Sequence, residues 1–180
     1  VFHFSVPDYL MLVLPLVKNA PLVSSPTRFV AVGGLVFKGD EVLLVRNRGR
    51  SQFHFPGGFA DPGEHLADAA LREVFEETSV TAEVESLIFL RHVHDNIFRK
   101  GHPLSDIYFV FRLKALSSNI RLQENELEAG GWWNIDEALA SEQVGEATRH
   151  SIRLGLKGEG LKRGWLEAYD YSEEMLETYG

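Results

Sequence analysis

Four glutamates and an arginine recur at short intervals in the stretch "GGFADPGEHLADAALREVFEETSV", residues 57–80. Glu73, Glu76 and Glu77 stand at positions i, i+3 and i+4, so a helix places them on one face. Like charges at this spacing repel by roughly 0.2–0.5 kcal/mol per pair, and near a helix C-terminus they also oppose the helix dipole. Carboxylate oxygens suit Mg²⁺ or Mn²⁺, which keep waters for a phosphate substrate. The pattern therefore favours a divalent-cation site.

The residues around these glutamates have the composition of a helix. Residues 65–78 are rich in the strong helix formers Leu, Ala, Arg and Glu and include neither Gly nor Pro. Helical spacing of apolar positions predicts a buried stripe of Ala67, Ala70, Leu71, Val74 and Thr78. Taken alone, such a helix is also typical of a solvated acidic face on which Arg72 pairs with Glu76. The residues that precede the helix decide between the two interpretations.

The spacing of the whole stretch resembles the Nudix box of the Nudix hydrolases. Gly58 is followed after five residues by Glu64, and after seven more by the run "REVFEETSV". Six charged or glycine positions match, which at ordinary residue frequencies is about one chance in ten million per starting position. One position departs from the box, because Ser79 replaces a glycine that serves the turn leaving the helix. A left-handed conformation there costs serine about 1–2 kcal/mol.

The resemblance continues over roughly residues 28–139, in segments such as "RFVAVGGLVF", "SDIYFVFRL" and "ENELEAGGWWNIDE". More narrowly, the chain is similar to the Nudix protein encoded antisense to a fibroblast growth factor gene and to the plant ADP-ribose/NADH pyrophosphatases. That group carries an Arg-x-x-His pair, matched by Arg91 and His94, and then a Ser/Thr-Asp pair, matched by Ser105 and Asp106.

The resemblance implies a site in which divalent metal, Mg²⁺ or Mn²⁺, helps water to split a diphosphate. The metal ligands it implies are Gly57 through its backbone carbonyl, Glu73, Glu76, Glu77 and Glu126. Gly58 and Glu64 are expected to support the geometry of the loop and helix. Arg72 is expected to orient the glutamates through charge-assisted hydrogen bonds.

The general base stays open between a box glutamate and an acid of the later loop "QENELEAGGWW". That loop offers Glu124, Glu126 and Glu128, of which Glu126 matches the family position best. Its alternative role is that of an ordinary exposed acid. The catalytic residues we expect are therefore Arg72, Glu76, Glu77 and Glu126.

Basic residues outside the box are candidates for substrate binding. Arg46 and Arg48, which end the second strand of an expected hairpin, are plausible phosphate contacts. Arg91 and His94 are expected phosphate or ribose contacts, with hydrogen bonding at a strand end as the alternative.

Composition sets limits on the protein class. The chain has 180 residues, 44% of them hydrophobic, which suits one compact domain. A net charge of −8 argues against bulk affinity for nucleic acid. The absence of cysteine excludes disulfides and cysteine nucleophiles and fits a reducing compartment, so we expect the cytoplasm. The longest apolar run, residues 9–17, is too short for a membrane helix, and no membrane partner is expected.

Strands and helices alternate along the chain, which predicts an α/β layer architecture. The expected strands are 29–37, 41–46, 81–95 and 105–116, followed by a short strand with a helix capped by Asp136, and a further helix within 142–156. The resemblance narrows this to the Nudix fold, an α-β-α sandwich around a mixed β-sheet. We expect an N-terminal extension at 1–26, the remnant of an upstream domain, a Nudix domain at 27–142 and a helical segment packed on it at 143–180.

The leading functional hypothesis is a metal-dependent pyrophosphohydrolase acting on a nucleoside diphosphate derivative such as ADP-ribose or NADH. An inositol pyrophosphate or capped-RNA hydrolase is an alternative, although such substrates favour a denser Lys/Arg cluster than "RNRGR" and "FRKGH" supply. A binding or regulatory module with weak catalysis is a third hypothesis. The loss of a box glutamate or of its arginine would favour it, and none of these residues is lost. The expected partner is a small-molecule diphosphate, and a homodimer is left open.

Overall fold

The computed structural model describes residues 2–6, 9–14, 16–18, 28–93, 105–164 and 178–180. Its helices are α1 (Leu66–Thr78), α2 (Ile135–Ala140) and α3 (Glu146–Leu156). Its strands are β1 (Phe2–Val6), β2 (Tyr9–Leu12), β3 (Arg28–Lys38), β4 (Glu41–Asn47), β5 (Gly57–Phe59), β6 (Ala82–Val93), β7 (Ser105–Ala115), β8 (Leu127–Asn134), β9 (Arg163–Gly164) and β10 (Thr178–Tyr179).

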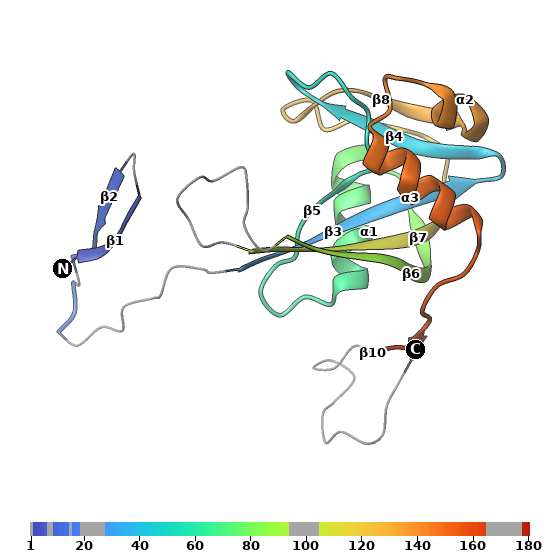
Figure 1. Ribbon diagram of the computed structural model, residues 1–180. Helices are drawn as coiled ribbons and strands as arrows, with labels where there is room; N and C mark the ends of the chain where they lie inside the picture. The colour runs from blue at the N-terminus through green and yellow to red at the C-terminus, as the bar shows by residue number, and fades with distance from the viewer. Residues whose placement is uncertain (1, 7–8, 15, 19–27, 94–104, 165–177) are drawn as a thin grey trace.

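A six-stranded sheet forms the centre of the molecule, in the order β6-β7-β3-β4-β8, with β5 paired to β3 beside this path. β3 and β7 run parallel, whereas β4, β5, β6 and β8 pair antiparallel with their neighbours. Helix α1 covers one face, and α2 and α3 lie on the other (Figure 1). The predicted α-β-α sandwich around a mixed sheet is therefore confirmed.

Each face of the sheet has its own core because side chains alternate along a strand. From β3, Val32 and Val36 pack with the α1 side chains, while Leu35 and Phe37 pack on the side of α2 and α3. The α1 core also holds Leu43, Ala67, Ala69, Ala70, Val74, Val80, Phe111 and Leu113. The opposite core also holds Val42, Leu44, Phe53, Phe55, Val110, Ala138, Val144 and Ile152.

The hairpin of β3 and β4 opens soon after its turn. The two strands pair only at Phe37↔Val42 and Lys38↔Glu41. Farther along, β3 pairs with β5, and Val45 of β4 pairs with His54. Residues 53–59 therefore fill the space between the diverging strands and carry the Gly57–Gly58 pair to β3.

Three local predictions differ from the structure. In α1, Leu71 is only partly buried, whereas Ala69 and Glu77 join the buried residues. The cap of α2 is Asn134 rather than Asp136, because the Asn134 side chain accepts hydrogen bonds from the N–H groups of Asp136 and Glu137. In the segment 143–180, helix is confined to α3 among the described residues, and β9 pairs with β10.

Helix α1 ends at Ser79 in the left-handed conformation expected for the glycine of the box, with φ 59°. We expect Ser79→Gly to raise the free energy of unfolding by about 0.5–1 kcal/mol, because glycine adopts this conformation without a Cβ clash. Urea denaturation measures the change. The matched control is Gly39→Ala in the open β3–β4 turn, where φ is 62°, and it should lower stability instead. A Ser79→Gly protein less stable than wild type would contradict the explanation.

Among the described residues, no helix combines the length and apolar character needed to cross a membrane.

Candidate active site

Arg72 of α1 is the centre of a hydrogen-bond network that joins the helix to the preceding loop. Its Nε and Nη2 donate to the two carboxylate oxygens of Glu64 at 2.8 and 2.9 Å. Its Nη1 donates to Glu73 at 2.8 Å and to Glu76 at 3.2 Å. Nη2 also donates to the carbonyl of Phe59 at 2.9 Å. Arg72 thus fixes the loop and two of the glutamates in one arrangement.

Glu73 lies directly against the Gly57–Gly58 pair. A Cβ on Gly58 would come within 2.6 Å of the Glu73 carboxylate, so only glycine allows this approach. Burial raises the pKa of Glu73, despite the opposing effect of the hydrogen bond from Arg72. Gly58 therefore lies against Glu73, whereas Glu64 is bound to Arg72, and the supporting role expected of both stays a prediction.

Glu77 is the most buried of the box glutamates, with 4% of the residue exposed. Its carboxylate accepts a hydrogen bond from the backbone N–H of Gly57, while Oε2 is buried and has no partner among the described residues. The pKa of Glu77 is raised to about 8, chiefly by burial and further by the nearby charges of Glu73, Glu126 and Glu76, against the lowering effect of the hydrogen bond from Gly57. A buried carboxylate with an unpartnered oxygen is costly unless a cation compensates it.

The acidic side chains of the box are the candidate ligands for a metal ion. The part of the chain that the structure describes contains no group of three His, Asp or Glu side chains arranged to hold a metal ion. The carboxylates of Glu64, Glu73 and Glu76 are instead paired with the Arg72 guanidinium. The residues nevertheless fit a divalent cation, since the unpartnered oxygen of Glu77 and the neighbouring acids are hard oxygen donors in need of positive charge.

The loop before β8 closes over the C-terminal end of α1. Its Gln123 N–H donates to the carbonyl of Glu77 at 3.0 Å, and its Arg121 N–H donates to the carbonyl of Thr78 at 2.8 Å. Glu126 in this loop is exposed and lies near enough for its charge to raise the pKa values of Glu73 and Glu77. A cavity of about 360 Å³ opens beside the loop, lined by Glu76, Ser79, Arg121, Leu122, Gln123 and Glu124.

Arg46 and Arg48 contact this same loop region. Arg46 pairs with Glu128 at 3.6 Å, and its guanidinium lies 5.0 Å from the Phe53 ring centroid. Arg48 donates from Nε to the carbonyl of Glu124 at 2.7 Å. Arg48 therefore holds the loop and Arg46 the beginning of β8, and their expected contact with substrate stays a prediction.

Arg91 lies apart from these arginines, on the edge strand β6. It pairs with Asp106 of β7 at 2.9 Å, and its guanidinium lies 5.1 Å from the Tyr108 ring centroid. His94 lies outside the described residues. Tyr108 carries no signal of its own in the sequence, because it stands within the continuous apolar run "IYFVF".

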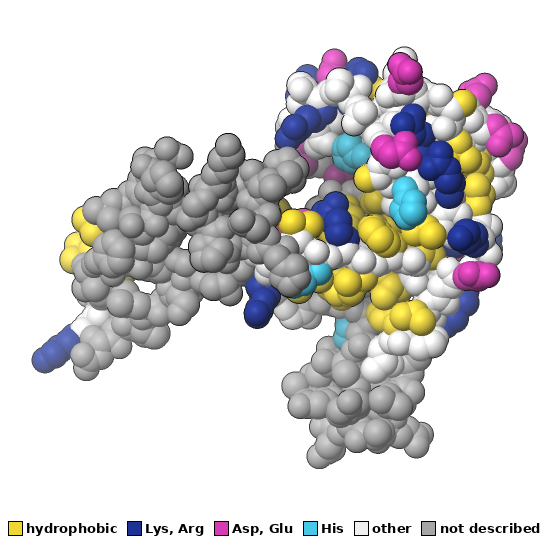
Figure 2. All heavy atoms as spheres, viewed as in Figure 1, with side chains coloured by type: hydrophobic (Ala, Val, Ile, Leu, Met, Phe, Trp, Pro, Cys, Tyr) yellow, Lys and Arg dark blue, Asp and Glu magenta, His cyan; other side chains and the backbone are white. Residues whose placement is uncertain are grey.

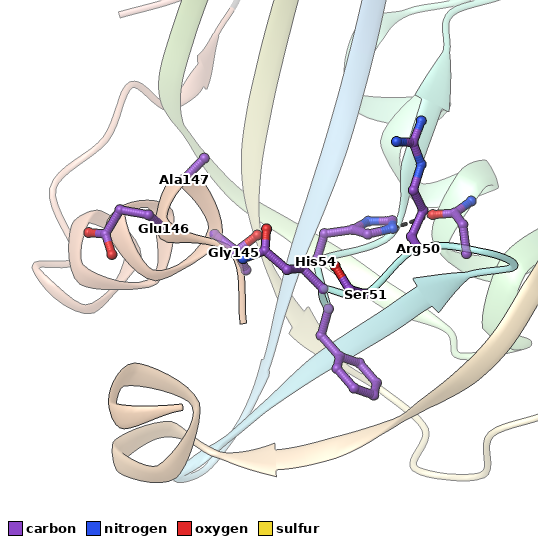
Figure 3. Close-up of a pocket in the computed structure, with 10 residues that line it drawn as sticks. Arg50, Ser51, His54, Gly145, Glu146 and Ala147 are labelled. Carbon is purple, nitrogen blue, oxygen red and sulfur yellow. Dashed lines mark hydrogen bonds between the residues drawn. The ribbon is translucent and has the colours of Figure 1, made fainter. Parts of the chain in front are cut away.

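A second cavity, of about 400 Å³, lies between the loop after β4 and the beginning of α3 (Figure 3). It is lined by Asn47, Arg50, Ser51, Gln52, Phe53, His54, Gly145, Glu146, Ala147 and Thr148. His54 Nε2 donates a hydrogen bond to Asn47 Oδ1 within it. Burial lowers the pKa of His54. None of the box glutamates lines this cavity.

The fold and the glutamate-bearing helix together define an α-β-α sandwich of the Nudix type. The family model of the NUDIX domain matches residues 27–154. Nudix hydrolase 2 of Arabidopsis thaliana is 36% identical over 145 residues, which cover 77% of this chain and 51% of that protein. Nucleoside diphosphate-linked moiety X motif 6 of Mus musculus is 35% identical over 180 residues, covering 97% and 56%. The chain belongs to the Nudix family.

Solved structures agree on the fold. A NUDIX hydrolase from Nitrosomonas europaea matches with a TM-score of 0.61 and 24% identity, over 82% of this chain and 98% of that one. A UDP-X diphosphatase matches with a TM-score of 0.58 and 22% identity, over 78% and 66%. At these identities the match concerns the fold alone. The chain spans about half the length of the two curated relatives.

Proposed function

We propose that the protein is a divalent-metal-dependent pyrophosphohydrolase that cleaves the diphosphate of a nucleoside diphosphate derivative, with ADP-ribose or NADH as the substrates to expect. The observation that carries the proposal is the Glu77 carboxylate, buried against the Gly57 N–H with Oε2 unpartnered among the described residues. Glu73 and Glu76 are the further ligands we propose for Mg²⁺ or Mn²⁺, and the Gly57 carbonyl and Glu126 complete the set.

When bound, the cation neutralises diphosphate charge and makes an attacking water more acidic. The other roles belong to side chains of this protein. Arg72 holds Glu73 and Glu76 in place through its hydrogen bonds. Glu126 is the general base we propose over Glu77, because Glu77 already accepts the Gly57 N–H and is buried, while Glu126 is exposed beside it.

The environment of Arg46 and Arg91 favours a diphosphate as substrate over a more highly charged compound. Arg46 and Arg91 are each paired with a carboxylate, which offsets part of their charge. Figure 2 shows Lys and Arg side chains interspersed with Asp and Glu side chains on the viewed face of the described residues. Such a surface is weakly suited to inositol pyrophosphate or capped RNA and to bulk nucleic acid. These hydrolases, and a weakly catalytic binding module, remain the alternatives.

The test is hydrolysis of a substrate panel with Mg²⁺ or Mn²⁺, containing ADP-ribose, NADH, NAD⁺, a diadenosine polyphosphate, an inositol pyrophosphate and capped RNA. The phosphomonoester products, such as AMP from ADP-ribose, are resolved by anion-exchange chromatography. We expect metal-dependent turnover with preference for ADP-ribose or NADH, abolished by a chelator. Preference for the inositol pyrophosphate or capped RNA would overturn the substrate. Absence of turnover on every compound would overturn the enzyme assignment in favour of the binding module.

We propose an N-terminal extension at residues 1–26, a Nudix domain at 27–142 and a segment at 143–180 packed on it. The fully buried Ile152 of α3 supports that packing. The partner is a small-molecule diphosphate. We keep the cytoplasm as the compartment, which the absence of cysteine fits, and a homodimer as an assembly that sedimentation would detect.

A further inference from the structure

Tyr108 of β7 lies between the arginine of β6 and the glycine pair beside α1. Its register partners are Arg91 on β6 and Ala31 on β3. The Arg91 guanidinium lies 5.1 Å from the Tyr108 ring centroid, within the range of a cation–π contact. Asp106 holds the same guanidinium at 2.9 Å. Ring and carboxylate together restrict where this guanidinium can lie.

The hydroxyl end of Tyr108 reaches the strand pair that supports Glu77. A Cβ on Gly33 would lie 2.6 Å from Tyr108 Oη, and a Cβ on Gly57 would lie 2.8 Å from it. Glycine at both positions is therefore what lets the hydroxyl lie against β3 and β5. Gly57 is also the residue whose N–H donates to Glu77. One rigid side chain thus contacts Arg91 at its ring and the support of Glu77 at its hydroxyl.

The surroundings of the ring keep it in place. The Phe55 ring packs against Tyr108 at a centroid distance of 6.4 Å. The charged groups that act on Tyr108 are Arg91, Glu77, Asp106 and Glu73. Arg91 of β6 contacts the ring, whereas the hydroxyl contacts Gly57, whose N–H donates to Glu77 of α1. Arg91 itself is 45% exposed, so its guanidinium is accessible to a ligand.

We propose that Tyr108 is a positioning residue, which sets the separation between the Arg91 guanidinium and the Glu77 carboxylate so that one diphosphate spans both. The inference rests on the proposed function. The diphosphate lies with one end at the glutamates and its cation and with the other end at Arg91. The aromatic ring determines this span because it is a planar spacer with few rotamers.

The experiment compares Tyr108→Leu, Tyr108→Phe, Arg91→Gln and the double variant Tyr108→Leu/Arg91→Gln. The readouts are KM and kcat on the best substrate of the panel, and the Kd of α,β-methylene-ADP with Mg²⁺ measured by calorimetry. We expect Tyr108→Leu to raise KM and Kd about tenfold and to change kcat less than about threefold. A tenfold loss of binding is what we expect when the cation–π contact is lost and the Arg91 guanidinium is no longer ordered. The Tyr108→Phe variant should keep KM and Kd close to the wild-type values, because it retains the aromatic ring.

Coupling separates positioning from packing. If Tyr108 acts through Arg91, KM and Kd of the double variant should be about those of the Arg91→Gln variant alone. If the two residues act independently, their effects would multiply and raise KM and Kd about a hundredfold. The control is Phe109→Leu, the next residue of β7, which packs on the α1 core and should lower the melting temperature without changing KM. A normal KM and Kd in Tyr108→Leu, or multiplicative effects in the double variant, would overturn the inference.

Two further outcomes are distinguishable. If Tyr108→Leu does not fold, Arg91→Lys tests the same link, because a flexible ammonium lacks the planar contact and should raise KM and Kd about fivefold. Unchanged values would overturn the inference. If the wild type neither turns over the panel nor binds α,β-methylene-ADP, the proposed function fails and the inference fails with it. An active wild type with a normal Tyr108→Leu variant overturns the inference alone.

Discussion

Glu77→Gln is expected to reduce metal-dependent hydrolysis at least about 100-fold, and to make the metal-free protein more stable at pH 8. Activity falls because an amide lacks the charge of the proposed cation ligand. Stability rises because the neutral amide removes a charge that is buried beside Gly57 with Oε2 unpartnered among the described residues. Lower activity together with higher stability is what we expect when a carboxylate kept for function is replaced.

The pH dependence of the second effect follows from the pKa of Glu77, which is raised to about 8 from 4.5. Because the folded protein binds this proton more tightly, stability from this group is fully present below pH 4.5 and is lost as the pH rises through about 8. The rise from 4.5 to about 8, at about 1.4 kcal/mol per pKa unit, sets an upper limit of about 5 kcal/mol. Because the new amide N–H₂ is itself buried without a partner, we expect Glu77→Gln to gain on the order of 2 kcal/mol at pH 8 with a chelator present.

Urea denaturation across pH 5–9 in a chelator checks this expectation. The matched control is Glu76→Gln on the same helix, whose side chain is 52% exposed and should give no gain. Glu83→Gln on β6, an exposed partner of Lys114, should change neither activity nor stability by more than about 0.5 kcal/mol. Added Mn²⁺ should stabilise the wild type more than Glu77→Gln. A metal-free Glu77→Gln protein no more stable than wild type would refute the account of the buried charge.

Arg72→Lys has the second large expected effect, although it preserves charge. The guanidinium donates to Glu64, Glu73, Glu76 and the Phe59 carbonyl at once. A single ammonium cannot reproduce a bidentate contact to Glu64 together with the others. We expect a loss of about 2–3 kcal/mol in unfolding free energy and about a 100-fold loss of activity, as partly buried carboxylates lose their partner.

The stability loss should depend on pH through Glu64. The hydrogen bond from Arg72 lowers the pKa of Glu64 below 4.5. Its contribution to stability is therefore present above pH 4.5 and is lost as the pH falls through the lowered pKa of the folded state. Wild type and Arg72→Lys should accordingly differ most near neutral pH and converge in acid.

Arg149→Lys on α3 is the matched control for Arg72→Lys. Arg149 also donates two hydrogen bonds to one carboxylate, that of Glu146, and contacts the Ser141 carbonyl. Because Glu146 is well exposed, we expect a loss of no more than about 1 kcal/mol and normal activity. Equal losses of activity in the two variants would show that the Arg72 network has no special part in the site.

Much of α1 could be predicted from the sequence because its information is local. Helical spacing placed Ala67, Ala70, Val74 and Thr78 on the buried face, and composition gave bounds within one residue of Leu66–Thr78. Because the box has a glycine where this chain has Ser79, the resemblance also predicted the left-handed turn at this residue. Spacing did not show that Glu77 is buried, because that depends on the strand pair and loop that pack against the helix end.

Tertiary structure decided which residues meet across the sheet. The parallel pairing of β3 with β7 and the antiparallel pairing of β6 with β7 bring Arg91, Tyr108 and Gly33 together from three separate segments. Register sets such contacts, and a shift by one residue would move every side chain to the other face. The sequence alone therefore left the role of Arg91 open and gave Tyr108 none.

The sequence by itself determined the family, the acidic helix and the residue types able to bind a cation, since helix geometry fixes the relative positions of Glu73, Glu76 and Glu77. Only the tertiary structure decided that Arg72 holds Glu64, Glu73 and Glu76 and that Gly57 donates to a buried Glu77. The physical reason is range, because spacing along one helix is a local property, whereas burial and electrostatic environment depend on segments that folding brings together.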